Sequence, residues 1–342
     1  MPELPEVEVV RAGLEPAVTG AVVSSVTVYD ARSLRRHDGP SKDFVERLTG
    51  RTIRAAVRRG KFLWLPLSPL KTQENSAIPV LSDPNCSDAG VSPAFSEGVA
   101  GTSLGAGTTA AEALVVHLGM SGQVLLRDRT TDDPLTRIRL DIVTSAGRDL
   151  RLNFVDQRIF GSMAIDRLVA TPDGRAAGRG DDAPLVPSQV AHIARDPLDP
   201  AFSDARFFAA LAKRRTGIKR ALLDQGLVSG IGNIYADEAL WAARIHYDQP
   251  TESLSRARAR MLLAEVRLVL GKALAEGGTS FDAQYVNVNG ASGYFSHSLN
   301  AYGQQGSACP RCGHPIVRDS FMNRGSHYCA FCQRVRAARA PR

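Results

Sequence analysis

The sequence lacks a long hydrophobic run and has few cysteines, and both absences exclude classes of protein. No stretch of the 342-residue sequence is apolar enough to cross a membrane. The first residues are acidic and interrupted by prolines, which is unlike a signal peptide. Only five cysteines occur, and four of them form two pairs near the C-terminus. This usage argues against a secreted disulfide framework and indicates a metal site in a reducing cytoplasm.

Acidic residues are scarce at one end of the chain. The formal net charge is +7 with a pI near 9.4, which favours a polyanionic partner such as nucleic acid. From Cys309 to Arg342 there are seven arginines against the single acid Asp319. The C-terminal tail therefore supplies most of the net positive charge.

The hydrophobic pattern changes once along the chain. Short runs with period two predict an all-β region, whereas the later part has the period of helices. The predicted strands cover 22–28, 52–58, 62–65, 114–117, 123–126, 138–143 and 150–154, and the predicted helices cover 207–211, 218–224, 235–243 and 255–275. The chain is long enough for two domains, so we predict a β-sandwich or barrel followed by a helical domain.

Composition marks the boundaries of these predicted domains. Residues 71–112 are rich in small and polar residues with almost no aromatics, which predicts a disordered insertion that carries Cys86 as a free thiol. Polar residues 171–190 predict that the strands stop at 170 and that a connection follows. We predict a first domain at 1–170, a linker at 171–200, a helical domain at 201–300 and a cysteine module at 301–342.

The first six residues, Met1-Pro2-Glu3-Leu4-Pro5-Glu6, have the chemistry of a nucleophile. Initiator methionine is normally removed before a small residue, so we expect Pro2 to carry a free secondary amine. An α-amino group has a pKa of roughly 8, so it is a better nucleophile near neutrality than lysine. Glu3 can donate or accept a proton beside it. The alternative is a plain helix start, with an apolar face from Leu4 until Gly13 and Pro16 stop it; that alternative does not explain Pro2-Glu3.

The four clustered cysteines have the spacing of a zinc site. Cys309-Pro-Arg-Cys312 and Cys329-Ala-Phe-Cys332 offer four thiolates on two knuckles, which is typical of one structural zinc ion. Arg324 lies near the turn between the knuckles, where a guanidinium could fork onto phosphate.

A glycine-rich turn, 227–238, joins two predicted helices. Gly230 and Gly232 allow close approach of a ligand, and Asn233 opens a helix whose free N–H groups favour a phosphate, with Lys219 on the preceding helix. A tight turn between helices with no ligand is the alternative.

Six motifs in order resemble bacterial formamidopyrimidine-DNA glycosylases over nearly the whole chain. They are the Pro-Glu-Leu-Pro-Glu start, Arg59-Gly60-Lys61, His117 to Gly122, Asp156 to Gly161, Gly232 to Tyr235 and the four-cysteine finger. The resemblance implies an α+β multidomain protein: an N-terminal helix and two-sheet β-sandwich, a helix-two-turn-helix domain and a zinc finger. It also implies a monomeric, cytoplasmic, nucleoid-associated enzyme of base excision repair whose partner is damaged double-stranded DNA.

The resemblance also implies roles for single residues. Pro2 would be the nucleophile at C1′, Glu3 its acid/base partner, and Lys61 and Arg324 would complete the catalytic set. Met120, Arg158 and Phe160 match a wedge that fills the space of an extruded nucleotide, with arginine on the orphaned cytosine. The remaining implied residues are His117, Lys219 and Asn233 on DNA, Glu6 and Tyr294 in the lesion pocket, and Cys309, Cys312, Cys329 and Cys332 on Zn²⁺.

The implied activity is excision of 8-oxoguanine and formamidopyrimidines through a proline Schiff base, followed by β,δ-elimination. Two features depart from the family. Where the family often has Pro-Arg-Arg-Phe-Gly, this chain has Gln157 to Gly161 with Ile159 in place of the second arginine, and the expected lesion-capping loop, 286–295, has an unfamiliar sequence. Two alternatives remain: an endonuclease VIII-like glycosylase for oxidised pyrimidines, against which Leu4 argues, and a non-catalytic DNA-binding zinc protein.

Overall fold

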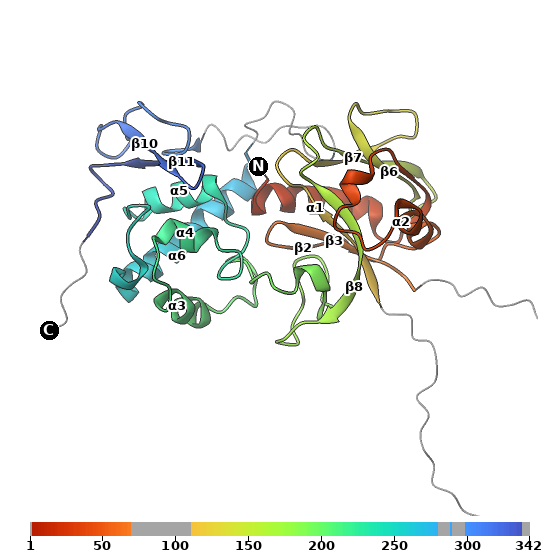
Figure 1. The fold of residues 1–342 in the computed structure, drawn as a ribbon, viewed down its shortest axis with the longest axis horizontal. Helices are drawn as coiled ribbons and strands as arrows, with labels where there is room; N and C mark the ends of the chain where they lie inside the picture. The colour runs from red at the N-terminus through yellow and green to blue at the C-terminus, as the bar shows by residue number, and fades with distance from the viewer. Residues whose placement is uncertain (1, 70–110, 280–287, 289–297, 337–342) are drawn as a thin grey trace, which may run out of the picture.

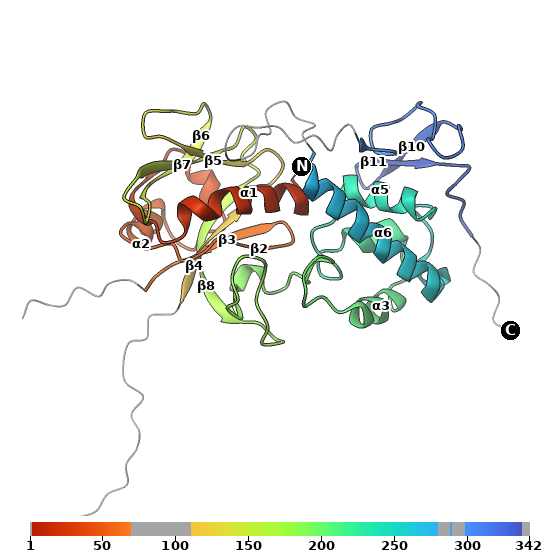
Figure 2. The ribbon, with the colours of Figure 1, turned by 180° about the vertical axis from the view of Figure 1, so that it is seen from behind.

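The chain folds into a β-rich half and a helical half that meet at the start of the first helix. Figures 1 and 2 show this computed structural model from opposite sides, with the sandwich at one end and the helices at the other. The structure describes residues 2–69, 111–279, 288 and 298–336. None of the described helices is both long and apolar enough to pass through a membrane.

The β-rich half contains two antiparallel sheets. One has the strand order β1-β6-β7-β5 and the other β2-β3-β4-β8-β9. The strands are β1 (Val22–Val28), β2 (Val57–Arg59), β3 (Phe62–Pro66), β4 (Glu112–His117), β5 (Gln123–Arg127), β6 (Thr136–Val143), β7 (Asp149–Val155), β8 (Ser162–Ala170) and β9 (Leu185–Pro187). Their inner faces share one apolar core, so the predicted β-sandwich is confirmed.

Helix α1 (Leu4–Val18) contributes to that core from its second turn onward. Val7, Val10 and Leu14 are buried among side chains from both sheets. The prediction that Gly13 and Pro16 end this helix is wrong, because the helix continues to Val18. A Cβ on Gly13 would lie 2.2 Å from the Val288 side chain, so this glycine permits close packing.

The β-rich half extends beyond residue 170. Strand β9 pairs with the end of β8, with Val169 opposite Val186, so the prediction that the strands stop at 170 is wrong. The polar composition of 171–184 reflects a long loop between two paired strands. The sequence analysis also missed β8, and it missed helix α2 (Ser41–Leu48), which buries only Phe44 and Leu48.

The helical half has a second core, which Leu4 of α1 joins. Its helices are α3 (Asp204–Ala212), α4 (Ile218–Leu223), α5 (Asn233–Ala242) and α6 (Arg256–Ala275). The described chain also contains three short 3-10 helices: η1 (Ala31–Leu34) and η2 (Ser188–Val190) come before α3, and η3 (Thr251–Ser253) lies between α5 and α6. The hairpin of β10 (Ile316–Phe321) and β11 (Arg324–Cys329) packs on α5. Figure 1 shows this hairpin beside α5, on the same side of the molecule as the start of α1.

Candidate functional site

Pro2 and Glu3 lie where α1 meets the start of α5, and both are buried. The Glu3 carboxylate accepts hydrogen bonds from the backbone N–H groups of Gly232, at 2.6 Å, and Ile234, at 3.0 Å. The N-terminus of α5 thus binds an anion within the chain, the Glu3 carboxylate, and the phosphate contact that the sequence suggests for this turn stays a prediction. The turn that opens a helix therefore orients an acid beside the amine-bearing residue.

Glycine is required at this junction because the two segments approach so closely. A Cβ on Gly232 would lie 2.3 Å from the Glu3 carboxyl carbon, and one on Gly230 would lie 2.7 Å from Leu4. Gly230 also has a φ of +87° and accepts a hydrogen bond from the Leu4 N–H at 3.0 Å. The predicted close approach of a ligand at these glycines stays a prediction, and in this structure the chain's own N-terminal segment makes the close approach.

Glu6 is buried, and its carboxylate joins three parts of the chain. It accepts hydrogen bonds from the Glu3 N–H at 2.7 Å, the Tyr235 hydroxyl at 2.5 Å and the Thr279 N–H at 2.8 Å. Glu6 therefore fixes the position of Glu3, and it reaches Thr279, which directly precedes residues 280–287. Its predicted place in a lesion pocket stays a prediction.

Lys61 lies on the β2–β3 turn and faces the same acids. Burial lowers the pKa of Lys61, while the charges of Glu3 and Glu6 oppose this and that of Arg324 adds to it. Burial likewise raises the pKa of Glu3, against the charge of Lys61. The predicted catalytic residues Glu3, Lys61 and Arg324 thus come together electrostatically in one site.

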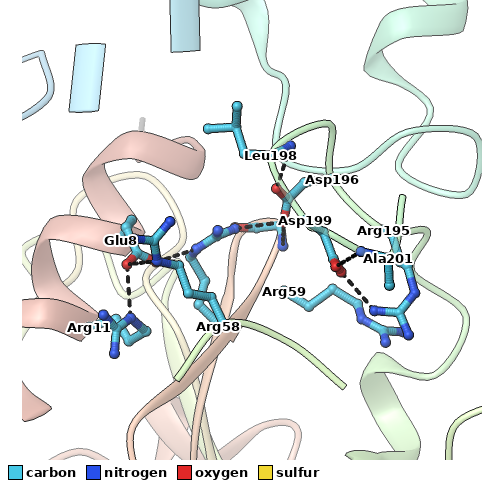
Figure 3. Close-up of polar contacts among 12 residues, drawn as sticks. Glu8, Arg11, Arg58, Arg59, Arg195, Asp196, Leu198, Asp199 and Ala201 are labelled. Carbon is cyan, nitrogen blue, oxygen red and sulfur yellow. Dashed lines mark hydrogen bonds and ion pairs between the residues drawn. The ribbon is translucent and has the colours of Figure 1, made fainter. Parts of the chain in front are cut away.

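Buried charges hold the turn that carries Lys61. Arg58 donates to Glu8 of α1 at 2.7 Å and to Asp196 at 2.9 Å, and it reaches the carbonyl of Gly60 at 3.2 Å. Asp196 also accepts from the Gly60 N–H at 3.4 Å. Figure 3 shows these side chains meeting between α1, β2 and the segment before α3 that carries Asp196. Sequence reasoning missed Arg58 and Asp196, because only the fold brings them together.

The β10–β11 hairpin is fastened to α5 next to Arg324. The side-chain nitrogens of Asn233 and Lys219 donate to the carbonyl of Gly325 at 3.0 and 3.4 Å. Lys219 pairs with Asp237 at 2.6 Å, and its side chain is fully buried. The predicted contact of Lys219 with phosphate disagrees with this placement, since a side chain without exposed surface cannot reach DNA. Asn233 and Lys219 position the backbone next to Arg324, and the predicted contact of Asn233 with DNA stays a prediction.

Two neighbouring loops present the predicted wedge residues at the surface. Met120 is 39% exposed and Phe160 is 49% exposed, although such large apolar side chains are usually buried. Arg158 is exposed beside them. A Cβ on Gly119 would lie 2.3 Å from the Phe160 carbonyl, so the loops touch backbone to backbone. The structure therefore groups the three residues as the sequence analysis expects.

Asp156 and Arg35 hold the wedge loop, and sequence reasoning did not assign either a role. The buried Asp156 carboxylate accepts from the Gly161 N–H at 2.7 Å and the Ser121 hydroxyl at 2.6 Å. Arg35 donates to the carbonyls of Ile159 and Gly161, both at 2.9 Å. The loop is therefore held in place before DNA arrives, despite the positive φ of 54° at Ile159.

His117 ends β4 just before these loops. Burial lowers its pKa to about 4, and Arg36, Arg35 and Lys61 act in the same direction. Its Nδ1 accepts a hydrogen bond from the Gly119 N–H at 3.2 Å, so the neutral ring carries its proton on Nε2. An uncharged donor in this position suits a predicted contact with a phosphate oxygen.

The four clustered cysteines fit one zinc ion. The sulfur atoms of Cys309, Cys312, Cys329 and Cys332 all lie within 4.8 Å of one another. Four thiolates are the donor set of a closed, structural zinc site, so the ion would supply folding energy and no chemistry. The Trp241 N–H of α5 reaches Cys309 Sγ at 3.4 Å, so the metal site is joined to the helical half.

Some predicted features lie outside the described residues. They are Tyr294, Cys86, nearly all of the expected capping loop 286–295, and nearly all of the expected insertion 71–112.

Comparison with known families gives matches along most of the chain. Residues 1–163 match the formamidopyrimidine-DNA glycosylase N-terminal domain, residues 193–284 the formamidopyrimidine-DNA glycosylase H2TH domain, and residues 306–335 the zinc finger found in FPG and IleRS.

Two curated relatives have the same name. The chain is 59% identical to the formamidopyrimidine-DNA glycosylase of Leifsonia xyli, over 98% of this chain and 100% of the relative. It is 49% identical to that of Thermobifida fusca, over 99% and 100%.

Solved structures agree with these matches. A Lactococcus lactis FPG mutant in complex with Fapy-dG-containing DNA superimposes with a TM-score of 0.72 at 25% identity, covering 97% of this chain and 100% of that one. The MutM (FPG) protein of Thermus thermophilus gives a TM-score of 0.69 at 31% identity, covering 98% and 100%.

Proposed function

Because this chain belongs to the formamidopyrimidine-DNA glycosylase family, and is therefore a DNA glycosylase of base excision repair, we propose that it excises oxidised purines by a covalent mechanism at Pro2. The observation that carries the proposal is the buried start of α1, where Pro2 adjoins Glu3 and Lys61 faces Glu3. Its natural substrates would include 8-oxoguanine and formamidopyrimidines, since the Lactococcus lactis relative is in complex with Fapy-dG-containing DNA.

The first step forms a bond between the Pro2 nitrogen and C1′ of the damaged nucleotide. The glycosidic bond breaks, and the departing base takes the electron pair and a proton. Loss of the sugar-ring C1′–O bond then gives an iminium ion, the Schiff base of a secondary amine. Glu3 is the proton carrier for these transfers, because it adjoins Pro2 in the chain and its pKa is raised by burial.

Strand cleavage follows from the same intermediate. Removal of a C2′ proton expels the 3′ phosphate, and a second elimination expels the 5′ phosphate, which leaves a one-nucleotide gap with phosphorylated ends. Lys61 and Arg324 would bind and neutralise these phosphates as they leave. The lowered pKa of Lys61 also allows it to accept a proton nearer to neutral pH.

Recognition would involve both strands. Extruding a nucleotide leaves a gap in the base stack, and Met120 and Phe160 are exposed apolar side chains that can fill it. Arg158 would hydrogen-bond the cytosine that lost its partner. This division of roles explains why such large apolar groups are held at the surface by Asp156 and Arg35.

Borohydride trapping tests the proposal directly. Incubating the protein with a duplex that contains 8-oxoguanine opposite cytosine, in the presence of borohydride, should give a stable protein–DNA adduct whose linkage maps to Pro2. Glu3→Gln should lower the excision rate while leaving the protein folded and able to bind DNA.

Other outcomes would point to the alternatives. Salt-dependent binding without any adduct or scission would indicate a non-catalytic DNA-binding protein. Trapping on oxidised pyrimidines in preference to 8-oxoguanine would indicate the substrate range of an endonuclease VIII-like enzyme. An adduct that mapped to a lysine would contradict the role of Pro2.

A further inference from the structure

A cavity lined by three arginines and by Asp173 lies between α3 and the segment that precedes it in the chain. Its volume is about 320 Å³, and its walls include Arg59, Ile193, Arg195, Ser203 and Arg206. Figures 1 and 2 both place α3 on the side of the molecule away from the β10–β11 hairpin. None of the residues that line the cavity is among those assigned to the site at Pro2, so the proposed reaction does not use it.

Arg59 is the unusual group in this cavity. The residue is only 4% exposed, and its Nε and Nη1 donate to the carbonyls of Ala177, at 2.6 Å, and Ile193, at 3.5 Å. In the part of the chain that the structure describes, no carboxylate lies within ion-pair distance of it and no acceptor bonds its Nη2. Asp199, Asp173 and Asp196 offset its charge only from beyond ion-pair distance. A buried guanidinium without a direct ion pair is costly, so its environment favours an added anion.

The neighbouring arginines, Arg58 and Arg195, each form two ion pairs, whereas Arg59 forms none with the described residues. Arg58 is bound to two carboxylates, and Arg195 pairs with Asp173 at 2.8 Å and Asp199 at 2.7 Å. Figure 3 shows Arg59 between these two networks. Burial lowers the pKa of Arg59 and the charge of Arg195 lowers it further, while the charges of Asp199, Asp173 and Asp196 oppose this. The acids nearby are thus already used by other arginines.

Two features of α3 add to the positive potential of the cavity. Ser203 is the N-cap of this nine-residue helix, so the positive end of the helix dipole borders the cavity. Arg206, in the first turn, is exposed and makes no ion pair with the described residues. Arg195 is paired with both Asp173 and Asp199, and these acids also partly offset the charge of Arg59, so the excess of positive charge at the cavity comes from the exposed Arg206.

We propose that this cavity binds a small phosphate-type oxyanion, either free phosphate or the phosphate group of a mononucleotide. The anion would accept hydrogen bonds from Arg59 and Arg206 and lie near the N-terminus of α3. Because Arg59 belongs to the sandwich and Arg206 to the helical half, an anion bound to both stabilises the junction between the two halves.

The test uses the full-length protein bound to a duplex that carries a tetrahydrofuran abasic analogue, so that cations facing the DNA are already occupied. Equilibrium dialysis with radiolabelled inorganic phosphate should show one saturable site per chain. A parallel titration with dGMP shows whether a nucleoside adds affinity. At constant ionic strength, saturating phosphate should also raise the melting temperature by about 2–4 °C, whereas chloride should not.

Three variants locate the site. Arg206→Ala alters an exposed residue and should weaken phosphate binding at least tenfold without changing the glycosylase rate. Ala210→Phe fills the cavity and leaves its charges intact, and it should abolish binding. Arg220→Gln removes an exposed arginine of α4 and is the matched control.

One contradicting result is a parent complex that binds no phosphate, and the other is binding by Arg206→Ala and Ala210→Phe as tight as that of the parent. Either result overturns the proposal. Arg59→Gln is a further check: provided that its melting curve shows a folded protein, it should also weaken phosphate binding.

Discussion

At the scale of single residues, the site is built from charged groups that have lost most of their water. Burial raises the pKa of Glu3 and lowers that of Lys61, so their pKa values move toward each other. A carboxyl group and an amine with converging pKa values can exchange protons with a substrate near neutral pH at a smaller free-energy cost. This arrangement favours proton transfer over a purely structural ion pair.

His117 should make stability depend on pH. Its pKa is about 4 in the folded protein and 6.5 when unperturbed, so below pH 6.5 the unfolded chain binds a proton that the folded chain does not. Stability should therefore fall as the pH drops from 6.5 toward 4, by about 3 kcal/mol at most. Urea unfolding at pH 7 and pH 4.5 measures this loss, and His117→Gln should reduce it. Replacing the exposed His192 with glutamine is the control; an equal loss in parent and His117→Gln would contradict the prediction.

Arg158 should determine the preference for the opposite base. If it hydrogen-bonds the widowed cytosine, excision of 8-oxoguanine should be efficient opposite C and poor opposite A. Losing one good base contact costs about 1–3 kcal/mol, which corresponds to roughly one to two decades in rate. Single-turnover excision opposite each of the four bases should show this preference in the parent and its loss in Arg158→Ala, whereas the neighbouring Gln157→Ala should behave like the parent. Equal excision opposite C and A by the parent would refute the assignment.

At the scale of elements, the site is an intersection of segments from both halves. Helix α1 brings Pro2 and Glu3, the β2–β3 turn brings Lys61, and the start of α5 orients Glu3. The turn is tightly enclosed, since a Cβ on Gly60 would lie 2.7 Å from the Ser229 hydroxyl. Small movements between elements should therefore change the reaction rate more than they change DNA affinity.

Asp196 should act as a positioning residue for Lys61. Asp196→Asn removes the charge that holds both Arg58 and the Gly60 N–H. We expect the single-turnover excision rate to fall at least tenfold while the Kd for DNA changes less than threefold. Asp199→Asn, in the same linker but paired with Arg195, is the matched control and should keep the parental rate. Equal losses in rate and affinity would indicate general disruption instead of a positioning role.

The zinc site should be required for DNA binding and dispensable for the sandwich. Cys309→Ser or removal of the metal should release the hairpin that bears Arg324, because a module this small has only a small core of its own. Fluorescence anisotropy should show loss of DNA binding, while thermal unfolding should still show a cooperative transition of the sandwich. Cys86→Ser is the control. A Cys309→Ser protein with parental affinity would show that the finger does not bind DNA.

At the scale of the whole molecule, two separate cores share one helix. Leu4 lies in the helical core, whereas Val7, Val10 and Leu14 lie in the sandwich core. The two halves therefore cannot separate without disturbing the helix that carries Pro2. Figure 2 shows α1 running from the junction into the sandwich.

Deleting residues 72–111 should leave both cores and the activity nearly intact. Strands β3 and β4 flank the segment and pair directly, with Pro66 opposite Ala113 and the Leu67 N–H bound to the Glu112 carbonyl at 2.9 Å. The chain leaves and re-enters the sheet at adjacent points, so a short Gly-Ser linker can close the gap, and loop length changes stability only slowly. The excision rate and melting temperature of the deletion variant check this. A large loss of either would show that the segment contacts DNA or supports the sheet.

The sequence by itself determined the local features of this protein. Cysteine spacing identified the zinc site, hydrophobic period separated the sandwich from the helices, and the order of short motifs indicated the family. These features depend on residues that are neighbours along the chain, so the sequence alone is enough to detect them. Prediction failed where the local signal opposed the tertiary packing: Gly13 and Pro16 resemble a helix end, yet α1 continues because its buried face packs into the sandwich core.

Only the tertiary structure decided which groups meet. The sequence does not show that the glycine-rich turn binds Glu3, because the two are more than two hundred residues apart in sequence. The sequence predicts Lys219 as a DNA-contacting cation, but in the folded chain Asp237 and the hairpin bury it. Strand β9 has no strong local signal, and its pairing with β8 defines it as a strand. Charge pairing and burial depend on distance in space, and that distance is fixed when the two cores pack on either side of α1.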